Sequence, residues 1–182
     1  MRRKIKGIID DIKKVLSMKD GMIMVKKQLK TVAAGTLIIY LAFLLKLVLF
    51  KQIPLHESPE HFAALSGDLI KQNFAYSNMT PFATVKRYMM VAHSRPGLSI
   101  PNLLGNLAGF IPFGLLIPVM VKKLRNSWLM LLLSFLFSLA LEIIQLSLAL
   151  GVFDVDDLLL NTAGGVFGYL LFSLLIKIGR SK

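Results

Sequence analysis

Apolar residues are gathered into four long stretches that alternate with polar segments. The stretches span residues 31–50, 102–121, 127–149 and 158–178, and hydrophobic residues make up 55% of the whole chain. A helix that crosses a bilayer needs about 20 mostly apolar residues, and each stretch meets that length. The pattern therefore predicts an all-α integral membrane protein, built as a bundle of four transmembrane helices.

The charged residues predict how this bundle is oriented. Residues 1–30, 122–126 and 177–182 together hold sixteen basic and three acidic residues, whereas 51–101 and 150–157 hold five basic and six acidic ones. Cytoplasmic segments of membrane proteins carry an excess of lysine and arginine. We therefore expect a multi-pass cell-membrane protein with both termini in the cytoplasm. The formal net charge of +12 then reflects topology and does not indicate nucleic-acid binding.

The basic segment 1–30 begins with a helical pattern of apolar residues. Five of them recur at helical spacing among charged residues: Ile5, Ile8, Ile9, Ile12 and Leu16. This pattern predicts an amphipathic helix that lies on the cytoplasmic surface of the membrane. A solvated helix that only helps to orient the chain is the alternative. Residues 31–182 then form the membrane domain.

Segment 51–101 is the longest polar part of the chain. It has no strong hydrophobic core, and the chain has no cysteine for a disulfide. We therefore expect a helical extracytoplasmic segment that lies against the membrane and the bundle. Thr80 is predicted to cap a helix with Pro81 at its first position and Phe82 next, and Arg95-Pro96-Gly97 is predicted to end it. Three histidines share no metal-ligand spacing and are expected at the surface: His56, His61 and His93.

Short turns predict how the helices pack. The turns at 122–126 and 150–157 leave little room for successive helices to separate, so we expect antiparallel packing of the second helix with the third and of the third with the fourth. Pro112 and Pro118 are expected to kink the second helix or end its regular part. Small residues on the second and fourth helices allow close backbone approach, and could also support an oligomer: Gly105, Ala108, Gly109, Gly164, Gly165 and Gly168.

Polar side chains interrupt three of the four predicted helices at a similar depth. Glu142 follows Ser127 by about 22 Å of helix at ~1.5 Å per residue, which places it roughly 8 Å inside a hydrocarbon core of ~30 Å. The predicted cluster consists of three pairs and one hydroxyl: Asn102 with Asn106, Glu142 with Gln145, Asp157 with Asn161, and Thr162. Ser134 and Ser138 lie deeper, and we expect them to hydrogen-bond to their own helix.

These polar residues either line a cavity in the outer leaflet or tie the helices together. Interhelical hydrogen bonds average only about 0.6 kcal/mol, which is a weak reason to keep a carboxylate at this depth. The acidic run Asp154-Val155-Asp156-Asp157 lacks the glycine and later glutamate of a calcium loop. Asp157 is expected to cap the fourth helix, and Asp154 to lie with it at the mouth of the cavity. We therefore favour a functional cavity, with no metal and no other cofactor.

Several of these residues occur in elements that resemble the VanZ-like family of membrane proteins. In chain order the elements are Met79-Thr80-Pro81-Phe82, Asn102-Leu-Leu-Gly-Asn106 with Phe110–Gly114, Glu142-Ile-Ile-Gln145, and Phe153–Tyr169. Members of that family often carry a basic residue just before the last element, where this chain has Gly151 and Val152. The resemblance implies a bacterial cell-membrane protein linked to resistance to the glycopeptide teicoplanin, with no settled reaction.

Three kinds of function fit these features. The first is a non-enzymatic envelope protein whose cavity binds a lipid-linked cell-wall precursor or a lipoglycopeptide, with Glu142 as acceptor or cation partner. The second is an enzyme or transporter that acts on envelope lipids, with Glu142 as base or proton carrier. The predicted cluster contains no histidine and no nucleophile–base pair, which disfavours the second. The third is a structural partner of another membrane protein.

Overall fold

A computed structural model describes residues 24, 28, 31–51, 53, 54, 56–92 and 96–180, and only the backbone at 91, 92, 96–102 and 180. The amphipathic helix predicted near the N-terminus and His93 lie outside the described residues. The chain divides into two units, residues 1–38 and 39–182.

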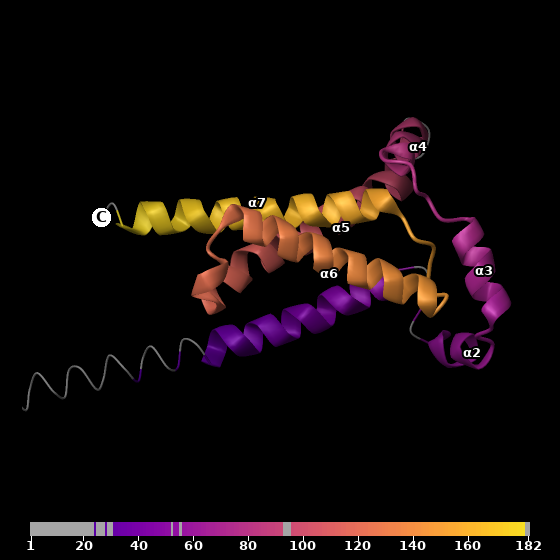
Figure 1. The fold of residues 1–182 in the computed structure, drawn as a ribbon, viewed down its shortest axis with the longest axis horizontal. Coiled ribbons are helices and arrows are strands. Elements are labelled where there is room, and N and C mark those ends of the chain that lie inside the picture. Colours follow the sequence, from indigo (N-terminus) through magenta and orange to yellow (C-terminus); the bar gives the residue numbers. More distant parts are fainter. Residues whose placement is uncertain are drawn as a thin grey trace, which may run out of the picture. The chain divides into compact units, whose positions relative to one another are not determined.

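Four helices are long and apolar enough to cross a membrane, and Figure 1 shows their order along the chain. The first spans Thr31–Leu49, and the other three spans lie within α5 (Pro96–Met120), α6 (Ser127–Ser147) and α7 (Val155–Arg180). The prediction of four membrane-spanning helices is confirmed in length and apolarity. Helix α5 begins six residues before the predicted 102, at Pro96, because the fixed φ of proline suits the first turn of a helix.

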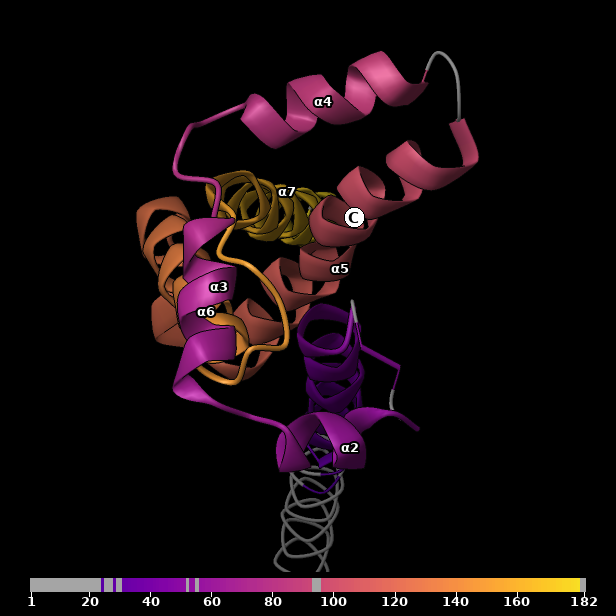
Figure 2. The ribbon, with the colours of Figure 1, turned by 90° about the vertical axis from the view of Figure 1, so that its right-hand side faces the viewer.

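Three short helices form the segment between the first span and α5: α2 (Ser58–Ala63), α3 (Gly67–Ala75) and α4 (Ala83–Ala92). In Figure 2, which looks along α7, helix α4 lies across the direction of the spans. The prediction that Thr80 caps this helix is wrong. Helix α4 begins at Ala83, and its first backbone N–H groups donate to the carboxylate of Asp156 in α7. A carboxylate satisfies several N–H groups and complements the helix dipole, which a threonine hydroxyl cannot match.

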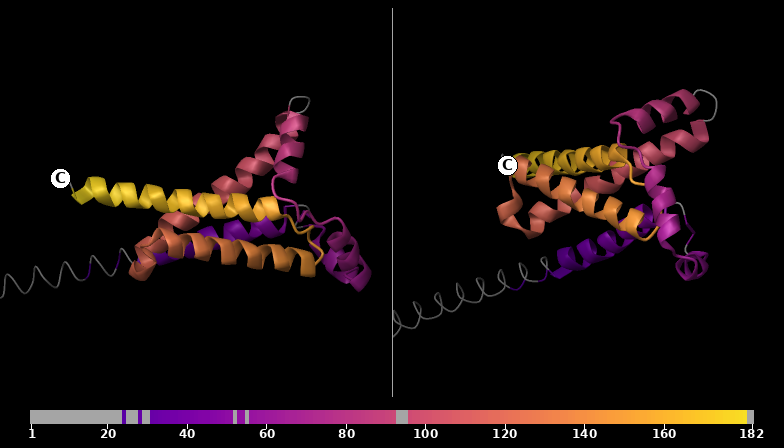
Figure 3. Two further views of the ribbon diagram at one scale, coloured as in Figure 1. Left: turned by 45° about the horizontal axis from the view of Figure 1, so that its top comes forward. Right: turned by 45° about the vertical axis from the view of Figure 1, so that its right-hand side comes forward.

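Helices α5 and α7 form the closest backbone contact of the described bundle. A Cβ atom added to Gly114 of α5 would lie 1.8 Å from the carbonyl oxygen of Gly165, and one added to Gly168 of α7 would lie 2.0 Å from that of Ile111. These glycines therefore let the two backbones touch. The second helix was expected to pack antiparallel with the third; it does contact α6, but its close glycine contact is with the fourth helix, α7. In both views of Figure 3, α7 runs along α5 and α6.

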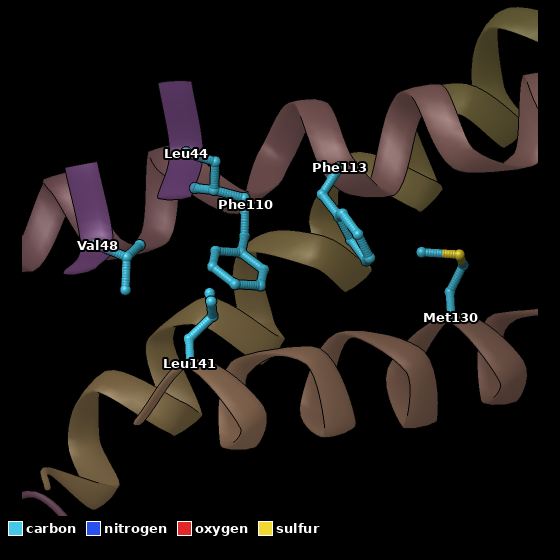
Figure 4. Packing of buried hydrophobic residues seen from close by; sticks show 6 residues of the cluster. All are labelled: Leu44, Val48, Phe110, Phe113, Met130 and Leu141. Carbon is cyan, nitrogen blue, oxygen red and sulfur yellow. The ribbon is translucent and has the colours of Figure 1, made fainter. Parts of the chain in front are cut away.

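Helices α5 and α6 meet through large side chains instead of backbone. The rings of Phe113 and Phe137 stack with their centroids 5.0 Å apart. The buried cluster drawn in Figure 4 joins them to the first span: Leu44, Val48, Phe110, Phe113, Met130 and Leu141. Helix α5 continues past Pro112 and ends at Met120, two residues after Pro118. The alternative, that the prolines kink this helix, stays a prediction. The carbonyl of Pro118 accepts a hydrogen bond from Arg125 Nε at 3.0 Å.

We expect Gly168→Ala to destabilise the bundle. The new methyl group would overlap the backbone of Ile111, so α5 and α7 must separate, at a cost of about 1–3 kcal/mol or more. Gly105→Ala is the matched control, because no atom lies within 4 Å of its added Cβ. Unfolding of the purified protein by SDS in mixed micelles, followed by circular dichroism, measures both. Equal unfolding midpoints for the two variants would contradict the α5–α7 contact.

Candidate functional site

The buried carboxylate of Glu142 binds the backbone just before α7. Glu142 lies on α6 and is 1% exposed. Its Oε2 accepts a hydrogen bond from the N–H of Asp154 at 3.0 Å. Its Oε1 is buried and has no hydrogen-bond partner among the residues that the structure describes. One oxygen of this carboxylate therefore fixes the turn between α6 and α7, and the other remains an available acceptor.

Asp154 connects this turn to the segment before α4. Its Oδ1 accepts from Asn78 Nδ2 at 2.9 Å, and its Oδ2 accepts from the hydroxyl of Thr84 at 2.6 Å. The same Oδ1 also accepts from the N–H of Asp156 at 2.9 Å, so Asp154 caps α7. The prediction that Asp157 is this cap is wrong, because α7 begins one turn earlier than expected, at Val155.

Asp156 holds the amino end of α4 against α7. Its side chain is 1% exposed. It accepts from the N–H groups of Phe82, Thr84 at 2.7 Å and Val85 at 3.0 Å. No role was expected for Asp156 from the sequence. Three acidic residues at the start of a long apolar helix nevertheless indicate that several N–H groups or cations lie close to them.

Asp157 makes a buried ion pair. Its two oxygens accept from the ammonium of Lys51 and from the side-chain amide of Asn106. Burial alone would lower the pKa of the Lys51 ammonium, but the charge and hydrogen bond of Asp157 outweigh burial and raise that pKa above its ordinary value. Lys51 was not expected to be a site residue. In the sequence it follows the first span, at the end of the bundle where the other spans carry their polar residues. We call this the polar end of the bundle.

The remaining predicted side chains are divided between this cluster and other contacts. Gln145 Nε2 donates to the carbonyl of Val48 at 2.8 Å, and Asn161 Nδ2 donates to the hydroxyl of Ser138 at 2.9 Å. Ser138 therefore joins two helices, contrary to the expectation that it bonds only within its own helix. Thr162 does bond within its helix, to the carbonyl of Leu158 at 2.7 Å, and does not join the cluster.

The Thr80-Pro81-Phe82 element contributes backbone to this site, not side chains. All three side chains are exposed, and the N–H of Phe82 donates to Asp156. The side chain of Asn102 lies outside the described residues. His61 Nε2 lies 2.9 Å from the carbonyl oxygen of Leu148, and His56 is exposed beside Glu57.

A polar cavity of about 200 Å³ opens beside these carboxylates. Its lining comes from the end of the first span, α4, α6, the turn before α7 and α7 itself: Lys51, Thr84, Arg87, Tyr88, Gln145, Val152, Asp154 and Asp157. Val152, which precedes the Phe153–Tyr169 element, lines this cavity without adding a charge to it. Here Lys51 and Arg87 supply the positive charges of the cavity from other elements.

An apolar groove of about 290 Å³ runs between the first span and α5. Its base is fixed by the hydroxyl of Tyr40, which donates to the carbonyl of Gly109 at 2.6 Å. Small residues on α5 leave the space, and large residues on the first span form the other wall: Gly105, Ala108, Gly109 and Pro112, opposite Tyr40, Phe43, Leu44 and Leu47.

The cavity offers binding chemistry. It presents ammonium, guanidinium, phenol, amide and carboxylate groups within one small volume. Such a set can bind a ligand that carries both donors and acceptors. In the part of the chain that the structure describes, no three histidine, aspartate or glutamate side chains are grouped so as to hold a metal ion.

Comparison with known proteins identifies the family. The model of the VanZ/LLP1 family matches residues 37–176. Protein VanZ of Enterococcus faecium is 32% identical over 157 residues, which cover 84% of this chain and 81% of that protein. No solved structure matches at a significant level. The matched range holds the cavity, the groove and the network of Asp154, Asp156 and Asp157, and the chain belongs to the VanZ/LLP1 family.

Proposed function

We propose that this protein binds the polar part of a lipid-linked envelope component or of a lipoglycopeptide in its polar cavity, and so contributes to resistance to teicoplanin. One observation carries the proposal, namely a small cavity at the end of four apolar helices in which Lys51 and Arg87 face Asp154 and Asp157. Membership of the VanZ/LLP1 family supports an envelope function.

The chemistry of the cavity suits a ligand with mixed polarity. Arg87 and Tyr88 offer donors for a phosphate or carboxylate, while Asp154 offers an acceptor for amide, hydroxyl or ammonium groups. Peptide and sugar groups carry donors and acceptors of this kind. Partly buried charges are costly near a bilayer, and side chains that are kept in spite of that cost are candidates for function.

The apolar groove supports a ligand that also carries a lipid chain. Leu47 lies near the end of the first span, and Lys51 follows that span two residues after its last residue, Leu49. On α5, Gly105 of the groove is adjacent to Asn106, which bonds to Asp157 of the cavity. Residues next to the groove on the first span and on α5 thus lead to Lys51 and Asp157 of the cavity, so an amphiphile can place its head in the cavity and its chain in the groove.

Glu142 does not itself line the cavity, but it bonds to the backbone of Asp154, which does, and we assign to Glu142 a hydrogen bond or a proton that it exchanges with a ligand bound there. Its Oε2 is committed to the turn before α7, but its buried Oε1 is not bonded within the described chain. A carboxylate is required for this role if the group that it meets is cationic or gives up a proton.

The orientation follows from the charge distribution. The turn between α5 and α6 holds Lys122, Lys123 and Arg125, and lies opposite the polar end of the bundle. With that turn in the cytoplasm, the cavity opens to the extracytoplasmic side, where cell-wall precursors and glycopeptides are found.

We expect single cysteines at Gln72 and Ser127 to report this orientation. Both residues are exposed, and the chain has no native cysteine. A membrane-impermeant maleimide should label Gln72→Cys in intact cells, and should label Ser127→Cys only after the cells are broken. The reverse pattern would place the cavity on the cytoplasmic side and reject the proposed ligands.

Glu142→Gln should abolish the resistance function while the protein still inserts and accumulates. The amide retains an acceptor for the N–H of Asp154, so the turn is preserved, but it cannot carry a charge or a proton. Asn106→Ala and Asn161→Ala should reduce function less severely, because each removes one neighbour. Teicoplanin susceptibility of a host strain measures function, and an immunoblot of membranes measures accumulation.

Thr162→Val is the matched control for these variants, because the Thr162 hydroxyl bonds only to its own helix in the structure. It should leave susceptibility unchanged. A normally expressed Glu142→Gln protein with wild-type resistance would reject the site as a functional one and favour a structural role for Glu142.

Lys51→Met should destabilise the protein by about 3–5 kcal/mol, because it leaves the partly buried Asp157 carboxylate without its cation. Adding Asp157→Asn should restore most of that stability, since a neutral amide needs no counter-charge. The double variant should remain inactive, because the cavity has lost the charges of Lys51 and Asp157. SDS unfolding and teicoplanin susceptibility separate the two effects. Full resistance in the stable double variant would show that this pair serves the fold alone.

A further inference from the structure

Helix α4 and the residue just before it carry exposed apolar side chains, and two of these residues, Phe82 and Val85, also line a groove against α7. Phe82, at its start, and Met89 and Met90, near its end, are 66%, 68% and 60% exposed. Phe82, Met89 and Met90 together with Val85 and Lys86 line one shallow depression. We call these three exposed residues the α4 apolar face. Methionine and phenylalanine at this exposure form a patch of the kind that marks an interaction surface.

The position of this face is fixed by buried bonds. Asp156 accepts the N–H groups of Phe82, Thr84 and Val85, so the first turn of α4 cannot leave α7 without stranding a buried carboxylate. The backbone of Phe82 has a φ of 66°, a left-handed value that is strained for a non-glycine residue. The network thus holds the Phe82 ring outward in spite of local strain.

The same bonds set the depth of α4 relative to a membrane. Asp156 lies in the first turn of α7, at the beginning of the membrane-spanning stretch Val155–Gly179. Helix α4 is therefore level with the end of a span, where the hydrocarbon core meets the headgroups. Figure 2 shows that it lies across the spans, which is the orientation of a helix in the plane of a bilayer.

We propose that α4 is an interfacial helix whose apolar face inserts into the bilayer leaflet at the polar end of the bundle. Exposed Lys86 lies beside the apolar residues, where an ammonium can meet lipid phosphate. The opposite side of the same helix supplies Thr84, Arg87 and Tyr88 to the cavity. Lipid contact on one side of α4 therefore positions a wall of the ligand site on the other.

Tryptophan fluorescence can test this placement, because the chain has a single tryptophan, Trp128. In a Trp128→Phe background, Met89→Trp is reconstituted into vesicles of phosphatidylcholine and phosphatidylglycerol, with or without lipid brominated on its acyl chains. We expect blue-shifted emission and roughly a twofold or greater loss of intensity with brominated lipid, as for an indole within the acyl boundary. Met90→Trp is a second reporter if the first variant fails to fold.

Asp68→Trp in the same background is the matched control. Asp68 lies on α3 with a 94% exposed side chain, so its replacement should emit like an indole in water and show little quenching. Red-shifted, unquenched emission from both α4 reporters would overturn the proposal. Blue-shifted but unquenched emission, with disulfide cross-linking of Met89→Cys between copies, would show that a second chain covers the face, which also overturns it. Neither result bears on ligand binding in the cavity, which is measured separately.

Discussion

The first turn of α7 brings three carboxylates to the end of a membrane span, and the rest of the polar end is arranged to satisfy them. Charged groups at this depth are stable only if N–H donors or cations surround them. Asp154 takes donors from Asn78 and Thr84, Asp156 takes the first N–H groups of α4, and Asp157 takes Lys51 and Asn106. Because these carboxylates bind the segment before α4, α4 itself, α5 and the residue after the first span, the start of one helix collects segments that lie far apart in the chain. The cavity is the space left beside this collection.

The parts that the sequence predicts well are those set by local composition. Hydrophobic runs identify the four spans, because length and apolarity are all that a bilayer requires of them. The polar pairs were also recognised, because an amide or carboxylate inside an apolar run is conspicuous. The position of Asn106, Glu142, Gln145 and Asp157 at one end of the bundle could therefore be predicted, whereas their depth in a membrane stays a prediction. The VanZ-like resemblance rests on these residues and was confirmed by the family match.

The parts that could not be predicted depend on partners distant in the sequence. Thr80 has the local features of a helix cap, but a carboxylate more than seventy residues later performs that role. The short turn after α5 indicates packing on α6, yet the glycines of α7 permit a closer approach and α5 packs there. Lys51 looks like an ordinary residue after a span until Asp157 is placed beside it. In each case, local propensity gave way to the need to satisfy a buried group or to fit two backbones together.

The place of α7 in the chain has a consequence for biosynthesis. Membrane proteins are made from the amino end, so the first span, α4, α5 and α6 are synthesised before the Asp154–Asp157 turn exists. Until then Lys51 lacks its counter-charge, Asn106 lacks its acceptor and the amino end of α4 lacks its cap. The polar end can close only when the last helix inserts. An incompletely synthesised chain would therefore display unsatisfied polar groups within the bilayer, a feature that allows a cell to distinguish unfinished protein from finished protein.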